Sequence, residues 1–171
     1  MSDLAIIVTG VSGSGKTTIG RLLAERLGWL FADADDFHPD SNVEKLTRQQ
    51  PLTDADREPW LAALCHWLDE QHERERDVVL ACSALKRRYR DRLRKDRPHT
   101  RFVYLHGARD VIARRLTHRE GHFMRAHMLE GQISDLEPPQ ADEGVITVDV
   151  DATPDQIVDE ILSKLESASQ A

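Results

Sequence analysis

The sequence predicts an α/β protein, a three-layer sandwich in which helices cover both faces of a five-stranded parallel sheet. Along the chain, short apolar runs alternate with segments of helical periodicity, which is typical of parallel strands joined by crossover helices. The first apolar run, Leu4–Val8, is continuous, as expected for a strand buried on both faces. A Gly-rich loop then separates this strand from an amphipathic helix. We see no internal repeat or interdomain linker, so we expect one domain over residues 1–171.

Four more strands follow the first. We expect them at Trp29–Phe31, Val78–Cys82, Phe102–Leu105 and Val145–Val150, each a short apolar run. A segment able to form a crossover helix lies between successive strands, so all five are expected to run in the same direction.

Helices are expected between these strands, where apolar side chains recur three or four residues apart. The helix after the Gly-rich loop should end at Gly28, which favours a C-terminal cap. A short helix is expected at Ser41–Leu46. A longer one follows, for which Thr53, Asp54 and Asp56 are available as N-terminal caps. The apolar helical faces are formed by Ile19, Leu22, Leu23 and Leu27, by Trp60, Leu61, Leu64 and Leu68, by Leu85, Tyr89 and Leu93, by Val111, Ile112 and Leu116, and by Ile157, Val158, Ile161, Leu162 and Leu165.

The composition is that of a globular protein. The net charge of −7 argues against a general nucleic-acid binder, so any recognition of an acid must rely on local basic clusters. Cys65 and Cys82 lie in apolar surroundings, and we expect buried thiols in a reducing cytosol. The first residues lack the features of a signal peptide, and no run reaches the roughly 18 apolar residues that a membrane span needs. These observations predict a cytoplasmic protein with no nucleic-acid or membrane partner.

The Gly-rich loop has the pattern G-x-x-x-x-G-K-[ST], which binds nucleotide phosphates. Glycines let the backbone curl so that consecutive N–H groups point at one anion, and the positive end of the following helix faces the same place. Lys16 adds a mobile cation for catalysis at the β- and γ-phosphates, and the Thr17 hydroxyl can ligate Mg²⁺. A chance match is the alternative, but the strand before and the helix after are the context that the motif requires. We therefore predict ATP and Mg²⁺ as cofactors, with nucleotide contacts from Gly10, Val11, Ser12, Gly13, Ser14, Gly15, Lys16, Thr17 and Thr18.

Two other classes of P-loop protein do not fit the sequence. A GTP switch protein needs a guanine-reading Asn-Lys-x-Asp segment, and the sequence has none. An ATPase motor usually carries an acid at the end of its third strand, whereas Val78–Ser83 contains no acid. The remaining class is a small kinase with an acceptor site and a lid, which we place at about residues 119–132.

Three carboxylates follow the second strand. A hydroxyl acceptor needs a nearby carboxylate that orients it or accepts its proton, and a second acid can hold Mg²⁺ through water. Asp33, Asp35 and Asp36 stand at the carboxyl end of that strand, where α/β folds build their sites. We predict Asp35 as the catalytic carboxylate and Asp33 as a Mg²⁺ ligand through water. A solvated acidic turn that caps the next helix is the alternative.

A basic run, Lys86–Lys95, follows the third strand. It could form a nucleic-acid patch, but such a run is more often a solvated helix face of which only the first turn reaches a site. Lys86 and Arg90 lie one turn apart and nearest to the strand, where they would serve an anionic acceptor. For residues 92–97 we expect a surface role.

Arg115 and Arg119 stand one turn apart, where the clear core pattern ends. In small kinases a closing lid brings arginines over the phosphates, so we predict both at the nucleotide and Arg119 in a catalytic role. An ordinary arginine cluster at a helix end is the alternative. His118 and His122 have a spacing that zinc ligands use, but the residues between them match no metallohydrolase helix, and we predict no metal there.

Taken in order, these segments resemble the gluconokinase family, the small ATP-dependent kinases of D-gluconate, which are related to shikimate kinase and nucleoside monophosphate kinases. The resemblance covers nearly the whole chain. Its most specific parts are the Asp-Arg-x-Pro-Trp-Leu segment at 56–61 and the Cys-Ser-Ala-Leu-Lys segment at 82–86. The matching segments are residues 10–17, 33–39, 42–45, 51–61, 81–91, 102–105, 121–124, 136–138 and 142–143.

The resemblance implies a fold like that of nucleoside monophosphate kinases and the reaction ATP + D-gluconate → ADP + 6-phospho-D-gluconate. It further implies Mg²⁺ dependence, a homodimer, and a lid arginine, Arg119, at the nucleotide. The residues that it places at the acceptor are Asp35, which would contact the reacting hydroxyl, and His38, Arg57, Lys86 and Arg90. The nearest alternative is another kinase of the same fold, acting on shikimate or a nucleoside monophosphate. A non-catalytic nucleotide-binding regulator is the second alternative.

Overall fold

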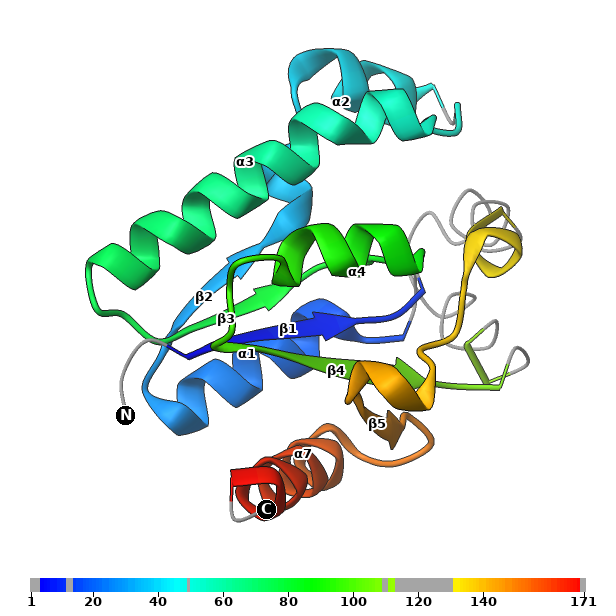
Figure 1. The fold of residues 1–171 in the computed structure, drawn as a ribbon. Helices are drawn as coiled ribbons and strands as arrows, with labels where there is room; N and C mark the ends of the chain where they lie inside the picture. The colour runs from blue at the N-terminus through cyan, green and yellow to red at the C-terminus, as the bar shows by residue number, and fades with distance from the viewer. Residues whose placement is uncertain (1–3, 12–13, 49, 109–110, 113–130, 170–171) are drawn as a thin grey trace.

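The five strands form one parallel sheet in the order β2-β3-β1-β4-β5 (Figure 1). The computed structural model describes residues 4–11, 14–48, 50–108, 111–112 and 131–169, and the structural statements concern these residues. The strands are β1 (Ala5–Thr9), β2 (Leu30–Asp33), β3 (Val78–Ala81), β4 (Thr100–His106) and β5 (Ile146–Asp149). The predicted fold class, with five parallel strands, is confirmed.

The central strand is β1, which is hydrogen-bonded to β3 on one side and to β4 on the other. Its Ile7 lies opposite Leu80 of β3 and Phe102 of β4. After β1 the chain builds β2 and β3 on one side of it, and then crosses to build β4 and β5 on the other. Such a reversal opens a crevice at the carboxyl ends of the strands. The loop that follows β1 therefore enters the crevice directly.

Helices cover both faces of the sheet, as Figure 1 shows. The pair α1 (Lys16–Leu27) and α7 (Pro154–Ser169) packs on one face, and the pair α3 (Asp54–Glu73) and α4 (Arg87–Arg94) packs on the other. The remaining helical segments are η1 (Ala34–Phe37), α2 (Asp40–Thr47), η2 (Ala141–Glu143) and the short stretches 111–112 and 131–135. Within the described ranges, no helix combines the length and the apolar character that crossing a bilayer requires.

Alternation along β1 divides its apolar side chains between two cores. Ile7 points into the core under α3 and α4, together with Leu64 and Leu93. Ile6 and Val8 point into the core under α1 and α7. Successive side chains of a strand face opposite sides, so a continuous apolar run is what burial on both faces requires.

Two predicted helix ends are confirmed, and two strands, the second and the fourth, are longer than predicted; the fourth runs from Thr100 to His106. Gly28 ends α1 with φ +73, and its N–H donates to the carbonyl of Glu25 at 3.2 Å. Thr53 begins α3 in a capping box, in which its hydroxyl accepts from the N–H of Asp56 and the Asp56 carboxylate accepts from the N–H of Thr53. The second strand, predicted to end at Phe31, continues to Asp33 because pairing with β3 persists up to Ala81.

Replacing Leu80 with alanine should destabilise the fold strongly. Leu80 is fully buried in β3, and removal of its methyl groups would leave a cavity between sheet and helices. We expect the free energy of unfolding to fall by about 2–5 kcal/mol in urea denaturation. The control is Leu30→Ala on the edge strand, where the side chain is 44% exposed, and the loss should be less than about 1 kcal/mol. Equal losses for the two variants would contradict this placement of β3.

Candidate active site

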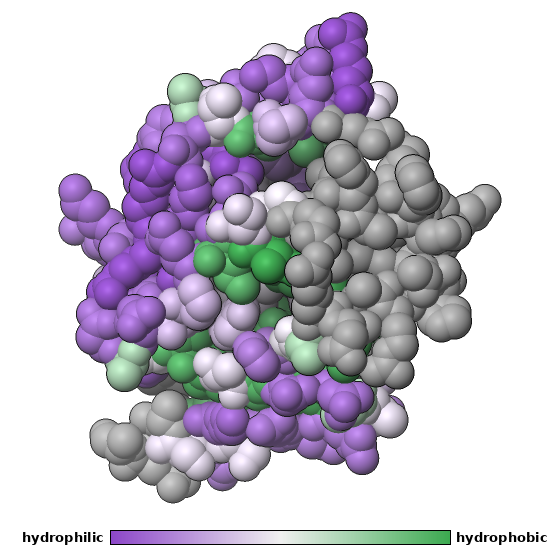
Figure 2. Space-filling view, turned by 90° about the vertical axis from the view of Figure 1, so that its right-hand side faces the viewer, coloured by the Kyte–Doolittle hydropathy of each residue, from purple (hydrophilic) through white to green (hydrophobic). Residues whose placement is uncertain are grey.

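The candidate site lies at the carboxyl ends of β1, β2 and β3. The phosphate loop follows β1, the 3₁₀ helix η1 follows β2, and the segment leading to α4 follows β3. Figure 2 looks onto this end of the molecule and shows hydrophilic side chains over much of the described surface, with a smaller hydrophobic area near the middle. Three neighbouring strands thus deliver the predicted donor and acceptor groups to one edge of the sheet.

The phosphate loop depends on glycine at both of its ends. Gly10 has φ +154, and a Cβ there would lie 2.7 Å from the Ser14 hydroxyl oxygen and 3.1 Å from the Leu105 carbonyl oxygen. Gly15 has φ +96 and forms the N-cap of α1. Both conformations disfavour any residue with a side chain. The loop can therefore approach the sheet closely and turn at once into α1.

The phosphate loop and the start of α1 carry several hydrogen-bond donors. Lys16 donates from its ammonium group to the carbonyl oxygen of Val11 at 3.2 Å, so its side chain folds back over the loop. Ser14 is fully buried, and its hydroxyl has no hydrogen-bond partner among the described residues. The first N–H groups of α1 have no partner within the helix, because every helix leaves them free. These donors and the helix dipole fit a phosphate group.

Thr17, at the end of the loop, and Asp33, at the end of β2, bring a hydroxyl and a carboxylate together. The Thr17 hydroxyl donates to one carboxylate oxygen of Asp33 at 2.8 Å. The other oxygen of Asp33 accepts from the backbone N–H of Asp35 at 2.9 Å, which fixes the carboxylate. Hydroxyl and carboxylate oxygens are the ligands that Mg²⁺ prefers, and it usually keeps several waters. The two residues therefore fit a magnesium ion held with the nucleotide.

Asp35 lies in η1, next to the phosphate loop. It is accessible to solvent, but the protein atoms around it still displace water, and this partial burial raises the pKa of its carboxyl group. The negative charges of Asp33 and Asp36 raise the pKa further, whereas the positive charge of Lys16 lowers it. A carboxylate with a raised pKa is a better proton acceptor. The placement of Asp35 near Lys16 joins the phosphate loop to the predicted acceptor side.

The thiol of Cys82 lies close enough to Asp35 and Lys16 for their charges to act on it. Burial raises the pKa of this thiol to about 12, and the charges of Asp35, Lys16 and Asp33 also act on it. The group is therefore a protonated, unreactive part of the core. Both Cys82 and Cys65 are buried free cysteines, as the sequence predicts.

His38 connects η1 with the helix that carries Arg57. Its ring stacks on Trp60 with a centroid distance of 4.6 Å, and its Nδ1 lies 3.2 Å from the side-chain nitrogen of Asn42. The Trp60 ring nitrogen donates to the carbonyl oxygen of Ala34 at 2.7 Å, which anchors η1. Burial, followed by the positive charge of Arg57, lowers the pKa of His38 to about 4. The imidazole is therefore neutral at physiological pH.

Arg57 and Lys86 lie around Tyr89, so two predicted acceptor ligands are brought together. The Arg57 guanidinium donates to the Tyr89 hydroxyl at 3.0 Å and lies 5.5 Å from the centre of its ring. The Lys86 ammonium lies 5.8 Å from the same ring centre and 3.3 Å from a carboxylate oxygen of Asp54. Tyr89 also donates to Asp54, which pairs with Arg88 as well. This cluster of cations is suited to an anionic acceptor.

Sequence reasoning missed Tyr89 and Asp54 as members of this cluster. Tyr89 was assigned only to the apolar stripe of its helix, and Asp54 only to a helix cap. The available signal was spacing, because Tyr89 lies three residues after Lys86 and such residues are neighbours on a helix. Nothing in the local sequence joins Asp54 to Lys86, since the two are 32 residues apart.

Arg90 occupies a different place from the one predicted. Its side chain is only 1% exposed. All five N–H groups of its guanidinium donate: three to the backbone carbonyl oxygens of Ala84, Leu85 and Glu137, and two to the carboxylate of Glu143. No donor is left for a substrate in this arrangement. The geometry therefore favours a structural role for Arg90 over the predicted role as an acceptor ligand.

Several predicted site residues lie outside the described residues. They are Ser12 and Gly13 of the phosphate loop, Arg115 and Arg119, and the predicted lid except for residues 131–132. His118 and His122 also lie in the undescribed range.

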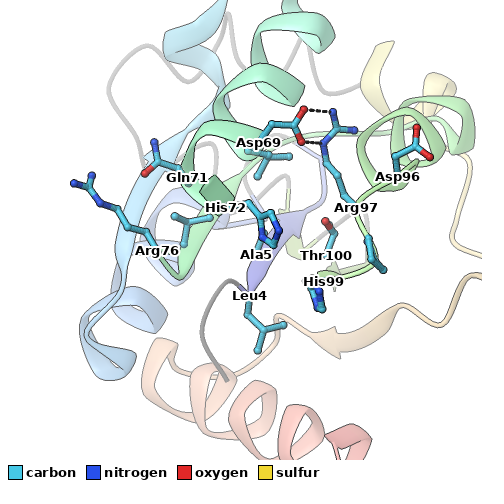
Figure 3. A pocket seen from close by; sticks show the side chains of 13 residues that line it. Leu4, Ala5, Asp69, Gln71, His72, Arg76, Asp96, Arg97, His99 and Thr100 are labelled. Atoms are coloured by element: carbon cyan, nitrogen blue, oxygen red, sulfur yellow. Dashed lines mark hydrogen bonds and ion pairs between the residues drawn. The ribbon is translucent and has the colours of Figure 1, made fainter. Parts of the chain in front are cut away.

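A pocket at the other edge of the sheet is separate from this site. It lies at the amino ends of β1, β3 and β4, and Figure 3 shows Arg97 paired with Asp69 at its rim. Its lining includes Ala5, Val78 and Thr100, which are the first residues of those three strands. The phosphate loop begins at the opposite end of β1, so this pocket has no part in phosphate binding.

The fold and the site together define the class. A phosphate loop between β1 and α1 of a parallel sheet, flanked by carboxylates and by a cluster of cations, belongs to a small P-loop kinase. A sequence model of the family described as shikimate kinase matches residues 12–166.

The relatives identify the family within this class. The gluconokinase of Gluconobacter oxydans (strain 621H) is 49% identical over 163 residues, covering 95% of this chain and 91% of the relative. A probable gluconokinase of Xenopus tropicalis is 45% identical over 178 residues, covering 95% and 94% of the two chains. The crystal structure of a gluconokinase from Sinorhizobium meliloti 1021 superposes with a TM-score of 0.89 at 43% identity, covering 98% of this chain and 94% of that one. The chain belongs to the gluconokinase family.

The low pKa of His38 predicts a pH-dependent loss of stability that a His38→Phe variant should not share. Between about pH 6.5 and pH 4 the unfolded chain takes up a proton on this histidine, whereas the folded protein does not. The free energy of unfolding of the wild type should therefore fall as the pH is lowered through this window. Phenylalanine keeps a ring against Trp60 but cannot titrate.

Thermal unfolding at pH 7 and pH 4.5, without ligands, measures this effect. The Tm of the wild type, relative to that of the variant, should be higher at pH 7 than at pH 4.5. A direct check is an NMR titration of the His38 ring, with a midpoint expected at about 4. A Tm difference that does not change with pH would contradict the prediction.

Proposed function

We propose that this protein transfers the γ-phosphate of ATP to D-gluconate, giving ADP and 6-phospho-D-gluconate. The observation that carries the proposal is its identity of 49% to a gluconokinase over 95% of the chain. The site supports it, because gluconate offers one carboxylate for cations and several hydroxyl groups for acids and amides. The chain is thus a phosphotransferase with an alcohol group as acceptor.

The phosphate loop holds the donor. Residues 10–18 bind the phosphates through backbone N–H groups, and Lys16 neutralises charge at the β- and γ-phosphates. The buried Ser14 hydroxyl is free to donate to a phosphate oxygen. Thr17 and Asp33 would hold Mg²⁺, the latter through water, and the ion would neutralise charge on the phosphates. Arg115 and Arg119 remain our proposal for arginines that cover the nucleotide.

Asp35 orients the acceptor hydroxyl and takes its proton. As the acceptor oxygen forms its bond to the γ-phosphorus, the bond between that phosphorus and the bridging oxygen of ADP breaks. The proton of the hydroxyl moves to the Asp35 carboxylate, which lies close enough to Lys16 for the two charges to interact. Its raised pKa favours this transfer.

The cation cluster binds the carboxylate of the acceptor. Lys86 and Arg57 both supply positive charge near the ring of Tyr89. His38, which is neutral, follows Asp35 and precedes Arg57 in the sequence. It interacts electrostatically with Arg57. A neutral imidazole can donate to or accept from a hydroxyl group of the acceptor.

We further propose the setting of the enzyme from the family resemblance. It is a single kinase domain over residues 1–171, with the lid at about 119–132, and it acts as a homodimer in the cytoplasm. The buried free thiols of Cys65 and Cys82 support a reducing compartment.

A comparison of acceptors tests the proposed function. ADP release with ATP and Mg²⁺ would be measured for gluconate, shikimate, AMP and CMP, by a coupled assay. We expect gluconate to give the highest kcat/KM by a wide margin. A preference for shikimate or a nucleoside monophosphate would overturn the choice of acceptor, and ATP binding without any acceptor-dependent ADP release would overturn the proposal of catalysis.

Asp35→Asn should abolish most turnover while leaving the fold intact. Loss of a general base costs about 10²- to 10⁴-fold in kcat. The raised pKa of Asp35 means that its ionised form is disfavoured in the folded state, so the neutral amide should leave the Tm unchanged or slightly higher. Asp40→Asn, which removes an exposed carboxylate at the start of α2, is the matched control. Near-normal turnover of Asp35→Asn would refute the assignment.

A further inference from the structure

Arg90 and Glu143 form a buried ion pair at the junction between two segments of the site edge. The Arg90 Nε lies 2.8 Å from one carboxylate oxygen of Glu143, and the two side chains are 1% and 0% exposed. One partner belongs to α4 and the other to η2. Neither Arg90 nor Glu143 takes part in the proposed catalysis.

The pair is fully satisfied by its surroundings. The Glu143 carboxylate accepts not only from Arg90 but also from the N–H of Gln140 and from Arg94. Burial by itself raises the pKa of Glu143, but these hydrogen bonds outweigh it and lower the pKa to about 2. A buried charge pair of this kind holds one arrangement of its neighbours, because any other would leave a charge unpaired.

On one side, the Arg90–Glu143 pair fixes the backbone just before Lys86. Arg90 donates to the carbonyl oxygens of Ala84 and Leu85, at 3.1 Å each. Ala84 has φ +38, a left-handed conformation that disfavours alanine. A strained residue persists only where its surroundings fix it. The strained turn leads directly to Lys86, which is the N-cap of α4.

On the other side, the Arg90–Glu143 pair fixes the segment from Glu137 to Glu143. Arg90 donates to the Glu137 carbonyl at 2.9 Å, and the Glu137 N–H donates to Leu85 at 2.8 Å. The Glu137 carboxylate in turn accepts from the N–H of Arg87 at 2.9 Å. The short helix 131–135 precedes this segment, and its Asp135 lies 3.9 Å from Arg57. The junction therefore adjoins both proposed acceptor ligands, Lys86 and Arg57.

We propose that Arg90 and Glu143 are positioning residues for the acceptor: their buried pair fixes the strained turn at Ala84 and so sets where Lys86 and Arg57 meet the acceptor carboxylate. This proposal rests on the proposed function. It predicts a selective effect on acceptor binding, whereas a pair that served only global stability would affect the donor and the acceptor alike.

The test compares two variants with two matched controls. Glu143→Gln keeps the shape of the side chain but removes its charge, and Arg90→Lys keeps the charge but cannot reproduce five donors in a fixed fork. Asp142→Asn alters the neighbouring residue, whose pair with Arg87 is exposed. Arg97→Lys alters an arginine that is also paired in a two-pronged fashion, with Asp69, at the opposite edge of the sheet (Figure 3).

We expect KM for gluconate to rise roughly 5- to 50-fold in both variants, because small displacements of binding groups are costly, while KM for ATP changes less than about twofold. Both controls should leave the two KM values within about twofold of the wild type. Equal increases in the two KM values, or no increase in a folded variant, would overturn the proposal. If Arg90→Lys does not fold, Glu143→Gln alone decides.

Hydrogen exchange provides a readout that does not depend on the acceptor. The N–H groups of Arg87 and Glu137 donate across the junction, so they should exchange faster in Glu143→Gln and at the wild-type rate in Asp142→Asn. Unchanged exchange in Glu143→Gln would overturn the proposal. If the wild type instead uses another acceptor of the panel, the proposed function fails, and the same KM comparison with that acceptor still decides the role of the pair.

Discussion

The close approach of Gly10 to Ser14 and to the Leu105 carbonyl is the constraint on which the site depends. It brings the backbone after β1 against the end of β4 and lets the chain turn immediately into α1. Because β1 is the central strand, the loop then stands between the two halves of the sheet. The segments that follow β2 and β3 end beside it, on one side only. That side receives the carboxylates and the cation cluster, and so the proposed donor and acceptor sites share one edge.

Local sequence patterns were enough to predict the layers and the place of the Gly-rich loop between β1 and α1. Apolar runs identified the five strands, most clearly β3, which is buried at every position because the sheet is covered on both faces there. Gly28 and Thr53 marked helix ends, since capping requires particular residues within one turn. The Gly-rich loop was predictable because the glycines that its backbone requires belong to a short motif. The order of the strands was not predictable in this way, because it follows from packing between distant segments.

The acceptor half was only partly predictable, because its geometry depends on contacts between distant parts of the chain. Lys86 and Arg90 look equivalent in sequence, one turn apart in a basic run. In the structure Lys86 stands at the start of α4 beside Asp54, whereas Arg90 is enclosed by a segment that comes 53 residues after it. Which basic residue meets solvent therefore depends on what packs over the helix. Arg90, which the sequence pattern predicts as a ligand, instead donates hydrogen bonds to the backbone just before Lys86.

The two halves of the site are linked through the charge of Asp35. Burial is the main cause of the raised pKa of this carboxyl group, the charges of Asp33 and Asp36 raise it further, and the charge of Lys16 lowers it. Its proton affinity therefore also depends on how these neighbours are engaged. A phosphate bound to Lys16 would offset its positive charge and so weaken its lowering of the Asp35 pKa. A cation near Asp33 would likewise weaken the raising of that pKa by Asp33. Binding of the donor would thus change the proton affinity of the carboxylate that we propose as the base. Because Lys16 and Asp33 belong to the nucleotide side, the donor half would adjust the strength of the proposed base, which burial raises first, while the cation cluster at Tyr89 would determine where the acceptor lies.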